Sequence, residues 1–313
     1  MTISPEPGAD TFGLLSTPGA IFSISHGIDY GADDVELIDC GVYEAAKGAV
    51  NLGEGGIGIS LVDLWQRVER CRFLSAYYPA SGTRAAKIAE AVAGAFDTVD
   101  VLILSQGGVY EQGDNLWERD RTQFIADMAK DGALEAAFDA SGTFRIRTPP
   151  ALDGSAPVWT FRTGEASNIV TADRERPLDR LYNTVVMQPM DDSQSWDQQT
   201  IVLADIDHPR HPSKIGVVPF FYKSATLNTP AEVTAAGIAI MQRVLGTTET
   251  VSITSVGNPA LEVGDVVSVV HAATDTDPGF QATHLIDSFQ MDLDTGAMSL
   301  ATRSSTLADL EES

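Results

Sequence analysis

Cysteine is scarce in this chain of 313 residues, in which Cys40 and Cys71 are the only two. They do not form a Cys-x-x-Cys pair, and two thiols are too few for a disulfide framework or a four-thiolate zinc site. Long apolar runs are missing too, because no segment approaches the roughly 18 apolar residues that a membrane helix needs. Residues 1–10 have neither the basic start nor the apolar stretch of a secretion signal. We therefore expect two buried free thiols, no membrane segment and no export signal.

Basic residues are also few: 20 lysines and arginines stand against 44 acidic residues, which gives a formal net charge of −24. The field around such a chain repels phosphate, so stable binding to nucleic acid is disfavoured. Two explanations of the acidic excess stay open, namely solubility and the lining of a channel through which DNA slides without sticking. The composition is otherwise that of a folded protein, with 43% apolar and 20% charged residues, and the length allows two or three domains.

Motifs of catalysis are absent from the sequence as well. It contains neither Gly-x-Ser-x-Gly nor a phosphate-binding P-loop, and neither cysteine stands in a context that suggests a paired histidine. The many acids are compatible with a pair of carboxylates for glycoside hydrolysis, but nothing selects such a pair. We therefore predict that the chain is not an enzyme, and we nominate no catalytic residue, no cofactor and no metal ligand.

A few short motifs imitate known sites. Gly53, Gly55 and Gly58 match the dinucleotide-binding pattern Gly-x-Gly-x-x-Gly, but the alternation over residues 57–61 predicts a strand where that pattern requires a helix. Residues 205–212 gather two aspartates with His208 and His211, which could hold a borderline metal ion, yet their two prolines favour a stiff polar turn. Residues 292–296 begin like a calcium loop but lack its later acidic positions, and residues 275–279 have the composition of a turn.

Hydrophobic periodicity predicts a β-rich first part followed by mixed structure. Extended runs at 21–25, 35–38, 42–45 and 57–61, separated by glycine-rich turns, predict a β-meander, and the apolar spacing over 61–71 predicts a short helix beside it. From residue 79 the pattern favours helices at 83–96 and 116–131, a strand at 99–104 and a hairpin over 136–147. Gly132 suits the position after the second helix, where a positive φ is common.

The second half of the chain reads as short strands with one strongly marked helix. Strands are expected at 182–187 and 200–203. Thr229, Pro230 and Glu232 form a capping box, and apolar residues recur at helical spacing up to Gly246, so we predict a helix over 229–245. Further strands are expected at 250–254, 265–271 and 284–287, with a closing hairpin of 289–293 and 297–301 that turns at 294–296.

Several of these segments, in this order, resemble a known family. In the second half they are Leu-Tyr-Asn-Thr-Val-Val at 181–186, the turn at 207–212, the capped helix, Asn-Pro-Ala-Leu-Glu-Val-Gly-Asp-Val-Val at 258–267, and the closing hairpin. In the first half they are Gly-Ile-Asp-Tyr-Gly at 27–31, Asp-Cys-Gly-Val-Tyr at 39–43, residues 57–63, and the helix of Trp117 with its hairpin. Together they are similar to the tail hub proteins of bacteriophages, which include minor tail proteins and, more distantly, baseplate hub and late-control D proteins.

The resemblance implies an α+β, mainly β fold with two tail-tube-like β-barrel domains and an α/β insertion. The expected domains are the β-rich part of the first barrel over residues 1–78, the insertion over 79–150, and β-barrel structure with one helix over 151–313. Only 26 residues precede Gly27, fewer than in comparable family members. The first barrel is therefore expected to be trimmed or completed by a neighbour.

The implied function is that of a structural virion protein, made in the host cytoplasm and placed at the distal end of the phage tail. There a homotrimeric tail (baseplate) hub joins the tail tube to tail-tip proteins and encloses the end of the DNA channel. The expected partners are further copies of the chain, a distal tail or tail-tube protein, the tape-measure protein and tail-tip or fibre proteins, with DNA only in transit. If acids line the channel, the candidates include Asp191, Asp192, Asp275 and Asp277.

Two alternative functions are compatible with a tail protein. A tail-tip module that contacts host cell-wall carbohydrate would favour an aromatic-rich face, whereas aromatic residues make up 7% of this chain and its four tryptophans are scattered. A cell-wall hydrolase fused to a hub would need a further domain, for which we expect no room.

Overall fold

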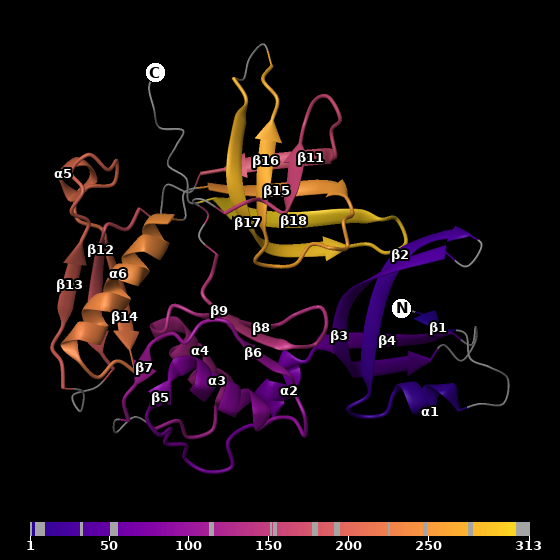
Figure 1. Cartoon of the computed structure of the whole chain (residues 1–313), viewed down its shortest axis with the longest axis horizontal. Helices are drawn as coiled ribbons and strands as arrows, with labels where there is room; N and C mark the ends of the chain where they lie inside the picture. Colours follow the sequence, from indigo (N-terminus) through magenta and orange to yellow (C-terminus); the bar gives the residue numbers. More distant parts are fainter. Residues whose placement is uncertain are drawn as a thin grey trace.

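The chain is mainly β with some helices, and its strands form five sheets within the described residues (Figure 1). No helix in that part of the chain has the length and apolar character needed to cross a membrane. The structure, a computed structural model, describes residues 2–3, 10–31, 34–50, 56–112, 116–150, 152, 155–176, 181–190, 195–224, 226–246, 249–274 and 278–304.

The first sheet is antiparallel and has the strand order β1-β4-β3-β2. Its strands are β1 (Thr2–Ile3), β2 (Ile21–Gly31), β3 (Asp34–Val50) and β4 (Ile57–Asp63), with the short helix α1 (Thr11–Leu15) before β2. The predicted meander is confirmed, but the runs expected at 35–38 and 42–45 are one strand, β3. The glycine-rich turn expected between the first two runs is also wrong for residues 27–31, which continue β2. A Cβ atom on Gly27 would lie 1.8 Å from the Glu36 carbonyl oxygen, so this glycine permits a close approach of two strands.

Helix α2 (Trp65–Arg70) follows this sheet. The predicted helix over 61–71 is therefore correct in kind but begins four residues late, because residues 61–63 pair with β3 as the end of β4. Local apolar spacing cannot reveal such pairing, since the partner strand is distant in sequence.

The next unit is an α/β layer with the sheet order β6-β9-β8. The strands β6 (Val101–Ile103), β8 (Glu135–Phe138) and β9 (Phe144–Arg147) share an apolar core with α3 (Arg84–Ala93) and α4 (Arg121–Asp131). Beside them β5 (Gly82–Thr83) pairs with β7 (Val109–Tyr110). The predicted elements are confirmed in order.

Two details of that prediction were wrong. The second helix starts at Arg121 rather than 116, because the side chain of Asp120 accepts the Gln123 N–H and caps the helix there, while Trp117 forms a bridge with Tyr77. Gly132 keeps a negative φ of −86°, and Ala133 adopts the positive φ of 50° instead.

The largest sheet has six strands and curls into a half-barrel (Figure 1). Its order is β10-β16-β17-β18-β15-β11, with apolar side chains from Phe161, Ile253, Val267 and Leu300 in its core. The expected strands at 284–287 and 289–293 form one strand with a bulge between Ile286 and Ser288. The six elements are β10 (Trp159–Arg162), β11 (Ile169–Glu175), β15 (Glu249–Val256), β16 (Val266–His271), β17 (Phe280–Met291) and β18 (Ala297–Ser304).

A three-stranded sheet, formed by chain that lies between β11 and β15, packs against the long helix α6 (Pro230–Gly246). Its strands are β12 (Thr184–Pro189), β13 (Gln199–Val202) and β14 (Pro219–Ser224), with α5 (Pro212–Ile215) before β14. The capping box is confirmed: Thr229 Oγ1 accepts the Glu232 N–H at 3.3 Å, and the Glu232 carboxylate accepts the Thr229 N–H at 3.1 Å. We call β12–β14 with α6 the α6 unit.

Candidate assembly surfaces

The side of the six-stranded sheet that faces away from its core carries small polar residues. In β15, Val251 and Ile253 are buried while Ser252 and Thr254 face outward, so the alternation of the strand separates an apolar side from a polar side. The outward residues form a shallow groove of about 460 Å³. The residues that line it are Thr171, Asp173, Ser252, Ile253, Thr254, Ser288, Phe289, Gln290, Ser299, Leu300 and Ala301, of which Ile253 and Leu300 belong to the core of the sheet.

This polar groove contains one carboxylate and no lysine or arginine. It therefore lacks both the apolar area that stable protein docking requires and the cations that hold phosphate. A face of this kind suits passage of an anionic polymer better than its binding.

The first sheet has a different surface, with an open edge and exposed apolar side chains. Among the described residues β2 pairs only with β3. Near the end of the β2–β3 hairpin, Tyr30, Val35 and Leu37 are exposed to 60%, 51% and 65%. An unpaired strand edge beside apolar side chains is a template for pairing with another chain. This hairpin is therefore the strongest candidate for contact with a neighbouring protein.

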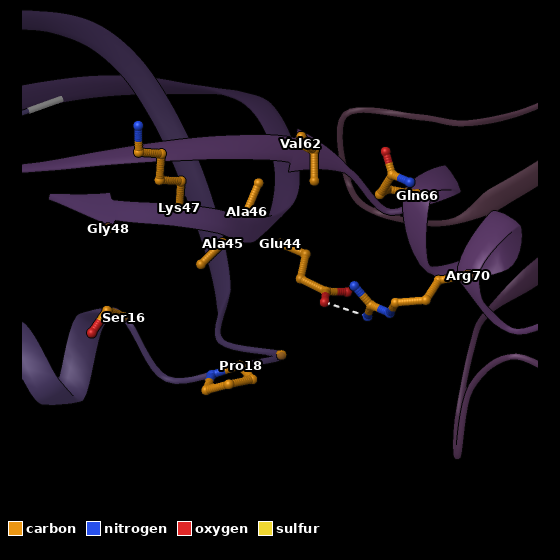
Figure 2. A pocket seen from close by; sticks show the side chains of 11 residues that line it. Ser16, Pro18, Glu44, Ala45, Ala46, Lys47, Gly48, Val62, Gln66 and Arg70 are labelled. Atoms are coloured by element: carbon orange, nitrogen blue, oxygen red, sulfur yellow. Dashed lines mark hydrogen bonds and ion pairs between the residues drawn. The ribbon is translucent and has the colours of Figure 1, made fainter.

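A pocket of about 640 Å³ lies beside the same sheet, between the α1–β2 connection, β3, β4 and α2. Figure 2 shows Glu44 on β3 and Arg70 on α2 pointing toward each other at its wall. Glu44 is 1% exposed and accepts bonds from Arg67 Nε at 2.8 Å and Arg70 Nη2 at 2.5 Å. Burial raises the pKa of the Glu44 carboxyl, but the two arginines outweigh it and hold that pKa below its ordinary value. The cluster fixes α2 to the sheet.

A second buried ionic cluster lies in the six-stranded sheet. Glu249 Oε2 accepts from Arg174 at 2.6 Å and from Arg176 at 2.9 Å. His284 is fully buried, its Nδ1 lies 3.0 Å from Thr302 Oγ1, and its Nε2 lies 3.9 Å from Glu249 Oε1. Burial lowers the pKa of His284 to about 4. Perturbed groups often mark functional sites, but this imidazole has no exposed surface through which to meet a substrate.

The short motifs that lie within the described residues have the expected structures, whereas the turn predicted over 275–279 lies largely outside those residues. Gly58 lies within β4, so the strand interpretation of 57–61 is confirmed, while Gly53 and Gly55 lie outside the described residues. In the 205–212 segment, His208 Nδ1 accepts the Arg210 N–H at 3.1 Å and His211 Nδ1 accepts the Ser213 N–H at 3.2 Å. These bonds make it a turn before α5, as predicted. No group of three potential metal ligands gathers anywhere in the described ranges.

Two of the remaining predictions can be compared with the structure, and a third concerns residues outside the described ranges. Asp292 Oδ1 accepts the N–H groups of Asp294 and Thr295 at 2.9 and 3.0 Å, which closes the predicted hairpin turn and lowers the pKa of that carboxyl. Cys40 and Cys71 are free thiols, as expected, but the expected burial is wrong, because both are only half-buried. The channel candidates Asp191, Asp192, Asp275 and Asp277 lie outside the described residues.

Comparisons with known proteins address the fold as a whole. No protein-family model matches the chain, and no curated protein sequence matches it. Among solved structures, a tail protein from Neisseria meningitidis matches with a TM-score of 0.63 at 14% identity, over 93% of this chain and 89% of that one. The chain has the fold of phage tail proteins.

Two further structures agree with this assignment. A tail protein of prophage MuSo2 from Shewanella oneidensis matches with a TM-score of 0.54 at 15% identity, over 92% of this chain and 91% of that one. The prophage tail protein gp18 from Listeria monocytogenes gives 0.55 at 12% identity, over 93% and 85%. Each of these matches spans nearly the whole chain. The phage-tail fold therefore includes the four-stranded and six-stranded sheets, the α/β layer of α3 and α4, and the α6 unit.

Sequence reasoning missed the buried ionic clusters of this phage-tail fold. Glu44 and the Arg67–Arg70 pair lie on separate elements and carry no joint pattern in the sequence. Arg67 and Arg70 at i, i+3 on a short helix were a weak signal, because such spacing places two cations on one helical face. Nothing local distinguishes His284 or Glu249 from ordinary strand residues.

Proposed function

We propose that the chain is a structural virion protein of a phage tail and acts through its interfaces, without catalysis. The observation that carries this proposal is the likeness in fold to a tail protein over 93% of the chain. The surfaces support it, because the described residues offer an open strand edge with exposed apolar side chains. In addition, the strongly perturbed histidine is enclosed in a core, where it cannot serve a reaction.

The proposed position is the tail (baseplate) hub, where the chain joins the tail tube to tail-tip proteins. In this arrangement the six-stranded half-barrel is one of two barrels, and the first sheet is completed by a neighbouring copy at its β2 edge. The first barrel takes residues 1–78, the insertion 79–150 and the second barrel 151–313, a region that also contains the α6 unit. Three copies with two barrels each then match a six-fold tube, and closed rings are the default symmetry for a repeated interface.

The test is the location and number of copies in purified particles. Gold-labelled antibody against the chain should mark the distal end of the tail, and density around the tail axis should show three copies. Absence of the chain from particles refutes the structural role. Six copies in a ring would contradict the two-barrel arrangement and leave the structural role intact. Retention of the isolated protein on host cell walls would favour the carbohydrate-binding alternative, although Trp117 and Trp196 are buried.

The acidic excess has a proposed function in the same assembly. Carboxylates repeated by symmetry around a channel form rings of like charge that keep phosphates from lodging, at a cost in repulsion that water and counterions screen over about 8 Å. Asp173 is a described residue that brings a carboxylate to the polar groove, as such a ring requires. The surface potential of the assembled ring decides the matter, since a neutral or basic bore would mean that the charge serves solubility alone.

A further inference from the structure

The α/β layer formed by β6, β8, β9, α3 and α4, which we call the α3–α4 layer, meets the α6 unit through hydrogen bonds and not through a shared apolar core. The apolar residues of the two units fall into separate clusters, one around Phe124 and Ile88 and the other around Val185 and Ile240. Each unit thus closes its own core. What joins them is a set of polar contacts, which we call the joint.

The centre of the joint is Asp131, the last residue of α4, which is 8% exposed. Its carboxylate accepts hydrogen bonds from the hydroxyls of Tyr222 at 2.5 Å and Ser224 at 2.6 Å, and also from the hydroxyl of Thr226. All three donors belong to β14 or the segment directly after it. One carboxylate on the α3–α4 layer therefore holds three hydroxyls of the α6 unit.

Other contacts of the joint are polar as well. The Lys130 ammonium lies 3.9 Å from the centroid of the Tyr222 ring. Arg84, which is 3% exposed, donates to the carbonyl of Val109 at 2.8 Å within its own layer and to that of Thr226 at 3.3 Å across the joint. The Asn228 side chain donates to the Glu111 carbonyl at 2.6 Å.

We propose that the joint is a latch, through which the α6 unit docks on the α3–α4 layer as a rigid body and can be released as one. Hydrogen bonds to a charged group stabilise the docked state while they stay buried, and water replaces them once the units part. Release uncovers no shared apolar core, so neither unit unfolds. Polar contacts between units of one chain are the kind that permit relative motion.

The other end of the α6 unit fixes where such motion would pivot. The chain enters the unit after β11 and leaves it before β15, and Arg176 Nε there lies 2.9 Å from Glu249 Oε2. The unit is therefore tied to the six-stranded sheet at one end and held by the latch at the other. This inference concerns the chain itself and does not depend on the proposed role in the tail.

The experiment measures the distance between spin labels on the two units by pulsed electron spin resonance. Labels are attached at cysteines replacing the exposed Glu90 on α3 and Gln242 on α6, after replacement of Cys40 and Cys71 by serine. The test variant is Asp131→Asn. The matched control is Asp127→Asn, one helical turn earlier, whose carboxylate accepts from Trp117 Nε1 at 2.9 Å and from Gln123 at 2.7 Å within the same layer.

We expect one short distance for the parent protein and for Asp127→Asn, and an added population of longer distances for Asp131→Asn, with the released fraction raised at least tenfold. An unchanged distance in Asp131→Asn would overturn the latch, and so would equal lengthening in both variants.

If Asp131→Asn does not fold, Tyr222→Phe removes one of the three hydroxyls and leaves the ring in its core. Hydrogen exchange in this variant must then rise at residues 222–227 without rising in α4 or α6, and a uniform rise would also overturn the proposal.

Discussion

The buried histidine of the six-stranded sheet predicts a specific dependence of stability on pH. His284 is fully buried, and burial lowers its pKa from 6.5 to about 4, although the nearby Glu249 carboxylate opposes this shift. Thr302 Oγ1 donates to the Val251 carbonyl at 3.1 Å, so it accepts from His284 Nδ1, which assigns the proton to Nδ1. His284 Nε2 then faces Glu249 Oε1 without a hydrogen between them.

The sign and size of the effect follow from these pKa values. Between pH 6.5 and pH 4 the unfolded chain binds a proton at this histidine and the folded chain does not, so acid favours unfolding. From the unfolded value of 6.5 and the folded value of about 4, stability should fall by about 2 kcal/mol between pH 7 and pH 5, and by about 3 kcal/mol by pH 4.

The assay compares urea unfolding of the parent protein with that of His284→Asn at pH 7, 6, 5 and 4. The variant loses packing and should be less stable at pH 7, but the difference should change by about 3 kcal/mol in its favour by pH 4. Glu249 and the other acids are present in both proteins, so their titration largely cancels. His284→Gln must show the same trend, whatever its packing cost. A difference that stays flat from pH 7 to pH 4 would falsify the argument.

Three further predictions concern stability. Glu44→Gln should lower the free energy of unfolding by about 1–3 kcal/mol in a urea titration, because it weakens buried bonds to two arginines. The control variant Glu69→Gln, on the exposed side of α2, should change that free energy by less than about 0.5 kcal/mol. Thr229→Ala should cost about 1 kcal/mol through loss of the α6 cap, and an unchanged melting temperature would contradict that role. A chelator should shift the melting temperature by less than about 4 °C, and a larger fall would revive a metal site at His208 and His211.

The elements that the sequence predicted well are those with local signals. The helix over 229–245 is marked by its own cap at Thr229 and Glu232 and by a glycine at its end. The hairpin of β17 and β18 is marked by turn residues between two alternating runs. In both cases the residues that determine the structure lie within a few positions of each other.

The errors arose where tertiary contacts decide. Gly27 has the appearance of a turn residue, yet it lies inside β2 because the Glu36 carbonyl of the paired strand leaves no space for a Cβ. Trp117 has helical spacing with Phe124, but its backbone pairs with Tyr77, 40 positions earlier in the chain. The joint is harder still to predict, since each of the three hydroxyl partners of Asp131 lies more than 90 positions after it in the sequence.

The placement of the few basic residues connects the fold to assembly. Arg84, Arg121 and Arg210 are less than 10% exposed and donate to carbonyl oxygens, with Arg121 Nε 2.6 Å from the Cys71 oxygen and Arg210 Nη1 3.2 Å from that of Val244. These three arginines are turned inward and so offer no charge at the surface to the acids of another copy, and the net charge of −24 makes copies of the chain repel one another. In the proposed ring, contact between copies would therefore come from apolar area and strand pairing. The hairpin of β2 and β3 offers both, and salt should strengthen the association by screening the repulsion.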